Sequence, residues 1–267
     1  MSHVTQARRL LLNLVLLLLL VGLGGMAWWY SQQPEPQAET LLSLTRADIT
    51  RVTITRELGR EKPDIIRLER EGERWRMLEP KQVEANATRV SQLFTLLDES
   101  VAASYESEGK DLSQYGLTLG EVSIAFNDEV LQFGIENPVS RKRYVLHAGK
   151  IKLVSEAVYG LLTGEATALV ANKLVPEGRS VKTVWLPEGF NTKAAGLLQN
   201  WQSADALRVE VYEGGTSKGK IILTLDDASR LEFELLSTQG ELILANIATR
   251  LRYVLADAQW INLLPIN

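Results

Sequence analysis

The sequence predicts an α+β protein, in which a single N-terminal transmembrane helix precedes two related modules, each a helix packed on a mainly antiparallel sheet. Three observations lead to this prediction. Residues 10–27 form an apolar run without a charged side chain. The rest of the chain is rich in short segments that alternate polar and apolar residues, as half-buried strands do. Finally, a tryptophan and a tetrapeptide each recur at nearly the same spacing.

The apolar run predicts a membrane anchor over residues 10–30. A helix needs about 20 apolar residues to cross a bilayer, and aromatic side chains favour the headgroup level where it ends. The alternative is a signal peptide cleaved after Ala27, but cleavage would leave a mature N-terminus of two tryptophans and a tyrosine. We therefore favour a retained anchor. The residues assigned to it are Leu10, Leu16, Leu20, Trp28, Trp29 and Tyr30.

The positive charges beside the run predict its orientation. Arg8 and Arg9 precede it, whereas no lysine or arginine follows it before Arg46. The positive-inside rule then makes residues 1–9 a cytoplasmic tail and places the C-terminal region in the periplasm of a bacterium, held at the inner membrane. Residues 31–46 begin with a polar, proline-containing stretch and are expected to form a linker.

Composition excludes several kinds of site. The formal charge is −4, and without Arg8 and Arg9 there are 27 basic residues against 33 acidic ones, which argues against nucleic acid as a partner. The absence of cysteine excludes disulfides, thiol catalysis and thiolate metal sites. A catalytic triad would have to use His147, because His3 would be cytoplasmic. We expect no cofactor, metal site or catalytic residue.

The first module is expected over residues 47–165. Residues 49–55 read as a strand, and 65–78 as a hairpin turning at 71–72. This register pairs Leu68 with Trp75 on the apolar face of the hairpin, where Trp75 should be buried. Its charged residues indicate a solvated face better than a carboxylate cluster. Pro80 ends the hairpin, and residues 83–98 carry apolar side chains at helical spacing.

One helical turn should follow at 111–117, with Asp111 as its N-cap, Tyr115 inside it and Gly116 ending it. The strands and helix expected after this turn lie at 122–126, 130–135, 143–146, 151–154 and 156–162, the last being helical.

The second module is expected over residues 166–267. A strand at 181–185 ends with Trp185, a helix covers 192–203, and Trp260 should pack as an anchor near the C-terminus. Trp75 and Trp185 are 110 positions apart, and the tetrapeptide RYVL recurs 109 positions after Arg143. The agreement predicts a duplicated module. The remaining strands are expected at 207–212, 220–225, 231–236, 242–245 and 251–255.

A phosphate-loop pattern occurs at residues 214–220, where Gly214, Gly219 and Lys220 satisfy GxxxxGK. Ile221 stands where the pattern requires serine or threonine, and a strand is expected where a helix should begin. The pattern therefore favours a flexible hairpin loop, and we expect no nucleotide as a partner.

Several of these features together resemble a known family. They are the N-terminal span, the spacing W-x-x-x-x-P from Trp75 to Pro80, the segment ANATRVSQLFTLL and the segment DLSQYGL. This combination is similar to membrane-anchored bacterial proteins built on a domain of unknown function, with the strongest similarity over residues 49–162. Members often accompany gliding-motility-type ABC transporter components and share a domain with their auxiliary subunits. The resemblance implies structural roles for its motif residues and no catalytic residues.

The expected function is that of a non-enzymatic auxiliary or scaffold subunit of an inner-membrane complex such as an ABC-type exporter. Its expected partners are the lipid bilayer and an integral-membrane protein. An alternative is a periplasmic module that binds polysaccharide or lipid through exposed aromatic residues such as Tyr105, Tyr115 or Trp201. A hydrolase ranks third, because it would need two unpaired carboxylates facing one cleft.

Overall fold

The computed structural model describes the backbone of residues 2–31, 39–57, 61–118 and 121–266. Within the N-terminal helix it describes the side chains of residues 14–26, 28 and 29. The described chain forms two units, one ending at Glu39 and one beginning at Thr40.

The first unit consists of helix α1 (Ser2–Ser31). Leu16, Leu20, Trp28 and Trp29 each expose more than half of their surface. The side chains of Leu10, Tyr30, Arg8 and Arg9 lie outside the described residues. Among the residues that are described, no helix combines the length and the apolar character needed to span a membrane.

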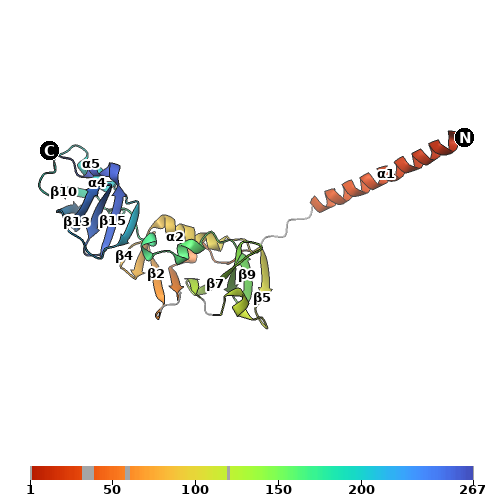
Figure 1. Cartoon of the computed structure of the whole chain (residues 1–267), viewed down its shortest axis with the longest axis horizontal. Helices are drawn as coiled ribbons and strands as arrows, with labels where there is room; N and C mark the ends of the chain where they lie inside the picture. Colours follow the sequence, from red (N-terminus) through yellow and green to blue (C-terminus); the bar gives the residue numbers. More distant parts are fainter. Residues whose placement is uncertain (1, 32–38, 58–60, 119–120, 267) are drawn as a thin grey trace. The chain divides into compact units, whose positions relative to one another are not determined.

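Nine of the described strands form one antiparallel sheet, which contains β5, β7 and β9 as labelled in Figure 1. Helix α2 (Ala87–Leu93) begins at the N-cap Asn86, whose side chain accepts a hydrogen bond from the Arg89 amide. In spatial order the strands are β4 (Val83–Glu84), β3 (Arg74–Glu79), β2 (Asp64–Glu71), β1 (Arg51–Arg56), β6 (Val122–Phe126), β7 (Glu129–Asn137), β8 (Lys142–His147), β9 (Lys150–Val154) and β5 (Ala103–Glu106).

Six further strands in the described part form a second antiparallel sheet, with helices α4 (Leu197–Gln202) and α5 (Trp260–Leu263) beside it (Figure 1). The α+β class with two antiparallel sheets is thus confirmed. In spatial order the strands are β10 (Val181–Trp185), β12 (Lys220–Leu225), β13 (Arg230–Gln239), β14 (Glu241–Asn246), β15 (Leu251–Ala256) and β11 (Arg208–Val211).

The two sheets share one plan of connections. In each sheet, a first strand is followed by a helix and then by a strand at the far edge of the sheet. The next four strands form a meander that fills the space between the first strand and this edge strand. The order β1-β6-β7-β8-β9-β5 therefore corresponds to β10-β12-β13-β14-β15-β11. The first sheet differs by three added strands, β2, β3 and β4, which lie outside β1.

The sequence similarities that predicted this repeat do not mark equivalent positions. Trp75 lies on β3, which has no counterpart among the described strands of the second sheet, whereas Trp185 lies on β10, the counterpart of β1. Arg143 belongs to β8 and Arg252 to β15, which is the counterpart of β9. Strand pairing, which the sequence spacings do not report, defines the correspondence: Val122 faces Phe133 as Ile221 faces Phe233.

The hairpin of β2 and β3 is present, but its predicted register is wrong. Leu68 pairs with Met77 rather than with Trp75, because Gly72 and Glu73 form the turn. Gly72 has a φ of 66°, the left-handed conformation that tight two-residue turns require. The error amounts to two residues, so every side chain keeps its face. Trp75 is consequently buried, as predicted.

The predicted helices are too long. Residues 83–84 pair with β3 as strand β4, so the helix expected from 83 begins only at Ala87 and ends in a 3₁₀ turn, η2 (Phe94–Leu97). The helix expected at 192–203 is α4, and the one expected at 156–162 is α3 (Tyr159–Thr163). The predictions were too long because neighbouring strand and loop residues also carry apolar side chains, and these continue the helical spacing beyond the ends of each helix.

The predicted linker, residues 31–46, also ends earlier than expected. Leu41 and Leu42 are buried, and the Leu41 amide donates to the Glu99 carbonyl at 2.8 Å. Their side chains join the apolar core of the second unit. Packing onto the first sheet thus begins at Thr40, which bridges to Ser100.

The predicted turn at 111–117 is a 3₁₀ helix, η3 (Leu112–Tyr115), and its caps are as expected. Asp111 accepts from the Ser113 amide, and Gly116 ends the turn with a φ of 68°. The turn packs on β7 at Gly134, where an added Cβ would lie 2.0 Å from the Tyr115 carbonyl oxygen. The Gln132 side chain donates to the Leu117 carbonyl at 2.6 Å. The motif therefore holds a loop against the sheet.

We expect Gly134→Ala to lower the free energy of unfolding by about 1–3 kcal/mol, because the new methyl group overlaps a backbone oxygen. Urea denaturation monitored by tryptophan fluorescence measures the change. Gly160→Ala is the matched control, since nothing lies within 4 Å of an added Cβ there. It should stay within about 1 kcal/mol of the wild type. Equal stability of the two variants would contradict this packing of the turn.

Candidate functional site

The described residues contain a cleft between strands β3 and β4 on one side and the second sheet on the other. Its volume is about 330 Å³, and a neighbouring hollow of about 210 Å³ shares part of its lining. Arg74, Trp75, Glu84 and Lys173 line both. Tyr253 of β15 lines the larger one.

An extended segment after η4 (Ala166–Leu169) builds the floor of this cleft. Val170 bridges to Ala85 beside β4, and Lys173 bridges to Asp205 before β11. The Ala171 amide donates to the Glu84 carbonyl at 2.9 Å. One segment thus pairs with both parts of the unit, and the cleft lies where the added strands β3 and β4 meet the second sheet.

The charged side chains of the cleft shift one another's ionisation. Lys173 Nζ lies 2.8 Å from Glu177 Oε1, which raises the pKa of the lysine and lowers that of Glu177. Burial raises the pKa of Glu84, although the positive charge of Arg74 opposes the shift. Burial and the nearby charge of Glu84 raise the pKa of Tyr253 to about 12. Its hydroxyl therefore stays protonated at neutral pH.

Two carboxylates with pKa values displaced in opposite directions are a pattern that general acid–base catalysis uses. In this cleft, however, Glu177 forms an ion pair with Lys173, and Arg74 and Lys173 both act on Glu84. The arrangement does not provide the two unpaired carboxylates that a hydrolase would need. Among the described residues, no three histidine or carboxylate side chains gather where they could hold a metal ion. The geometry fits a group of charges that offset one another where the two sheets meet.

We expect Glu84→Gln to stabilise the protein at pH 7. A folded-state pKa above the ordinary 4.5 means that the folded protein binds the proton more tightly than the unfolded chain, so stability falls as pH rises through this window. Glutamine removes that loss. The gain should disappear below about pH 4, where glutamate is protonated in both states. Urea denaturation at both pH values measures it.

Glu177→Gln is the control of opposite sign, because the folded-state pKa of Glu177 is lowered. This variant should be less stable than the wild type at pH 7, and the difference should also fade in acid. If the Glu84→Gln variant is instead less stable at pH 7, the attraction between Arg74 and the Glu84 carboxylate is stronger than the destabilising effect of burying that carboxylate.

The structure does not bring the motif residues together in one site. Trp75 borders the cleft, and its ring centroid lies 5.5 Å from that of Phe94 in the core. Pro80 follows β3, as predicted. Asp111, Tyr115 and Gly116 belong to the η3 turn. Trp185 exposes 53% of its surface on β10, and Trp260 starts α5 and packs against the core.

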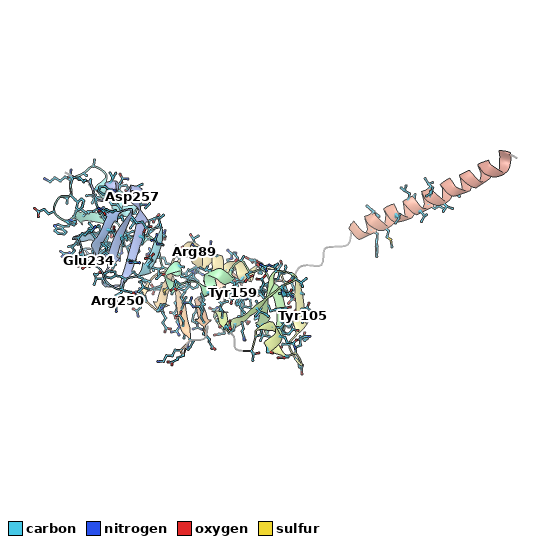
Figure 2. All side chains as sticks on the ribbon, in the orientation of Figure 1. Arg89, Tyr105, Tyr159, Glu234, Arg250 and Asp257 are labelled. Atoms are coloured by element: carbon cyan, nitrogen blue, oxygen red, sulfur yellow. The ribbon has the colours of Figure 1, made fainter. Side chains whose placement is uncertain are left out.

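The aromatic residues proposed to bind polysaccharide do not form a common groove. Trp201 is completely buried, so its assignment as an exposed aromatic was wrong. The Tyr115 ring packs edge-on against Tyr144 with centroids 5.0 Å apart. Tyr105 remains exposed on the edge strand β5, where Figure 2 labels it. Each of the three therefore has a different environment.

The phosphate-loop pattern is followed by a strand, as expected, because β12 begins at Lys220. Lys220 forms an ion pair with Glu232 on β13 at 2.5 Å. The loop is not a hairpin, however. It joins β11, at one edge of the sheet, to β12, which lies beside the opposite edge. The hairpin prediction failed because the loop sequence does not report which strands pair.

The open edges of the second sheet were not predicted from the sequence. Trp185 on β10, Leu207 before β11 and Val211 on β11 expose between 46% and 65% of their surfaces. An alternating strand pattern does not distinguish an edge strand from a central one in an antiparallel sheet. The signal that was present in the sequence is the pair of polar residues Lys182 and Thr183, which interrupts the alternation after Val181 in β10.

Searches against protein-family models, curated proteins and solved structures returned no match to this chain. The resemblance to membrane-anchored companions of ABC transporters therefore stays a prediction from the sequence motifs.

Proposed function

We propose that this protein is a membrane-anchored, non-enzymatic scaffold subunit of an inner-membrane complex such as an ABC-type exporter, and that it acts through protein–protein contacts. The observation that carries the proposal is the set of exposed apolar side chains at the two edges of the second sheet: Trp185 at 53%, Leu207 at 65% and Val211 at 46% exposure. Soluble proteins usually protect sheet edges, and large exposed apolar side chains there favour a partner.

The anchor in this proposal is the segment 10–30 of helix α1. Its described side chains from Leu14 to Met26 are apolar or glycine. Of these, the large hydrophobic ones each expose at least 48% of their surface, so none is buried against protein. Lipid would cover them, and Arg8 and Arg9 would hold the preceding tail in the cytoplasm. The second unit would then lie in the periplasm.

The proposal includes the origin of the two modules, 47–165 and 166–267, by duplication. Their shared strand order supports it, as does a bulge at the same place in each meander: the register shifts between β7 and β8 and again between β13 and β14. The added strands β2 to β4 would be a later elaboration of the first module.

Co-purification tests the proposed function. Full-length protein extracted from its native membrane in mild detergent should elute with a stoichiometric integral-membrane protein. The Leu207→Asp/Val211→Asp variant changes only exposed positions at the β11 edge. If this variant no longer co-purifies with the membrane partner, the contact lies at that edge. Full-length protein that purifies alone and monomeric, and that hydrolyses a glycan or an ester, would contradict the scaffold proposal.

A further inference from the structure

Within the described part of the chain, strand β10 lacks a neighbour that its counterpart β1 possesses. In the first sheet, β1 pairs with β6 on one side and with β2 on the other. In the second sheet, β10 pairs with β12, and the described residues place no strand on its other side. The same connection plan therefore holds an additional antiparallel strand in one sheet and leaves its position empty in the other.

The two edges correspond in their pairing, except that a register shift between Val181 and Thr183 makes Lys182 an extra residue in β10. Val52 and Ile54 of β1 face Phe126 and Ile124, as Val181 and Val184 of β10 face Leu225 and Leu223. Val184 thus takes the place of Ile54. The β2 residue opposite Ile54 is Ile66, which is fully buried. An apolar side chain opposite Val184 would find the equivalent position on β10.

The outer edge of β10 is accessible over four residues. Gln202 closes its start, because its side-chain oxygen accepts a hydrogen bond from the Val181 amide at 2.8 Å. From Lys182 to Val184 the edge borders a groove of about 640 Å³, whose opposite wall is the segment 192–199. Lys182, Thr183 and Trp185 are exposed. Backbone donors and acceptors at an open edge pair readily with an extended chain.

The charge of the groove indicates what would occupy it. Lys182 and Lys193 line it, and neither has an ion-pair partner among the described residues. No acidic side chain contributes to its described lining. An acidic segment therefore complements the groove, and an apolar residue in its centre would pack against Val184.

We propose that the outer edge of β10 binds an extended acidic segment of a partner protein as an additional antiparallel strand, in the position that β2 occupies on β1. This inference rests on the proposed scaffold function and names the surface through which it operates. Main-chain hydrogen bonds would supply affinity, and the lysines and Val184 would select the sequence.

The chain itself provides the probe. The β2 sequence, DIIRLERE, places Arg67 opposite Thr53, the counterpart of Thr183. Replacing this arginine gives the acidic peptide DIIELERE. We expect the full-length protein in detergent to bind the fluorescein-labelled acidic peptide saturably in fluorescence anisotropy. It should bind DIIRLERE more weakly. In the Lys182→Glu/Lys193→Glu variant, affinity for the acidic peptide should fall by about tenfold and the preference should reverse.

Hydrogen exchange locates the bound peptide. Amide exchange at residues 182–185 should slow when the acidic peptide binds, while the edge strand β11 should be unaffected. Absence of binding, binding that ignores the charge reversal, or protection at β11 instead would overturn the proposal. So would a concentration-dependent dimer that the Trp185→Asp substitution disrupts, since a second copy would then occupy the edge.

The two proposals fail in different ways. Full-length protein that co-purifies with a membrane partner but binds neither peptide would refute the β10 site and leave the scaffold function standing. Protein that binds the acidic peptide at β10 as described, but has no partner in its membrane, would support the site and refute the scaffold function.

Discussion

Replacing Trp201 with alanine is expected to lower the free energy of unfolding by about 3–5 kcal/mol, which is a large part of the 5–15 kcal/mol typical of a folded domain. Trp201 lies in α4 with no exposed surface, and its indole Nε1 donates to the Leu263 carbonyl at 3.0 Å. The substitution leaves a cavity and removes the donor to that carbonyl. Urea denaturation followed by circular dichroism measures the loss.

Trp185→Ala is the matched control, because the same side chain is removed from a position that is 53% exposed. It should cost about 1 kcal/mol or less. Trp201→Phe should fall between the two, since it keeps most of the volume but loses the hydrogen bond. If Trp201→Ala and Trp185→Ala were equally stable, α4 would not pack on the second sheet as described.

Removing the carboxylate of Asp64 is expected to cost about 3–5 kcal/mol. Arg56 of β1 is 5% exposed, and its guanidinium contacts Asp64 of β2 and the Gly164 carbonyl. Asp64→Ala would leave the buried positive charge without this carboxylate. Chemical denaturation near pH 7 measures the change.

Asp128→Ala is the matched control for this ion pair. Asp128 lies 3.2 Å from Arg51, but its side chain is 97% exposed, so its loss should cost between 0 and about 1 kcal/mol. The double substitution Arg56→Met/Asp64→Leu should recover much of the stability lost in Asp64→Ala, because it removes the buried charge as well. A small effect of Asp64→Ala would show that Arg56 does not depend on this partner.

Local patterns in the sequence predicted the strands well and their arrangement poorly. Alternation located β6 and β12 at their observed bounds, because each strand has one buried face. Asp111 and Gly116 marked a turn through their own backbone preferences. The β2–β3 register depended on which residues form the turn, and the turn at Gly72 and Glu73 shifted the pairing by two residues.

The features that bear on function depend on contacts between distant segments, which a single sequence does not reveal. The cleft brings Glu84, Lys173 and Tyr253 together from three parts of the chain. The burial of Trp201 depends on the C-terminal helix α5, 62 residues away, which accepts its hydrogen bond. The open edge of β10 follows from its pairing with β12 at the end of the sheet order. Each of these features depends on how the strands and helices are arranged in space. The recurring RYVL tetrapeptide did not reveal that arrangement, because its two copies lie on β8 and β15, which are not equivalent strands.

The most direct test of the central claim, that a partner covers the β10 edge in the membrane, is the reactivity of a single thiol. The chain has no cysteine, so Thr183→Cys introduces a unique site for a bulky maleimide. Val139→Cys, in a turn position that is 92% exposed, is the control. We expect Thr183→Cys to react much more slowly in native membrane fragments than in protein purified free of partners, whereas Val139→Cys reacts alike in both. Equal rates for Thr183→Cys in the two preparations would contradict the claim.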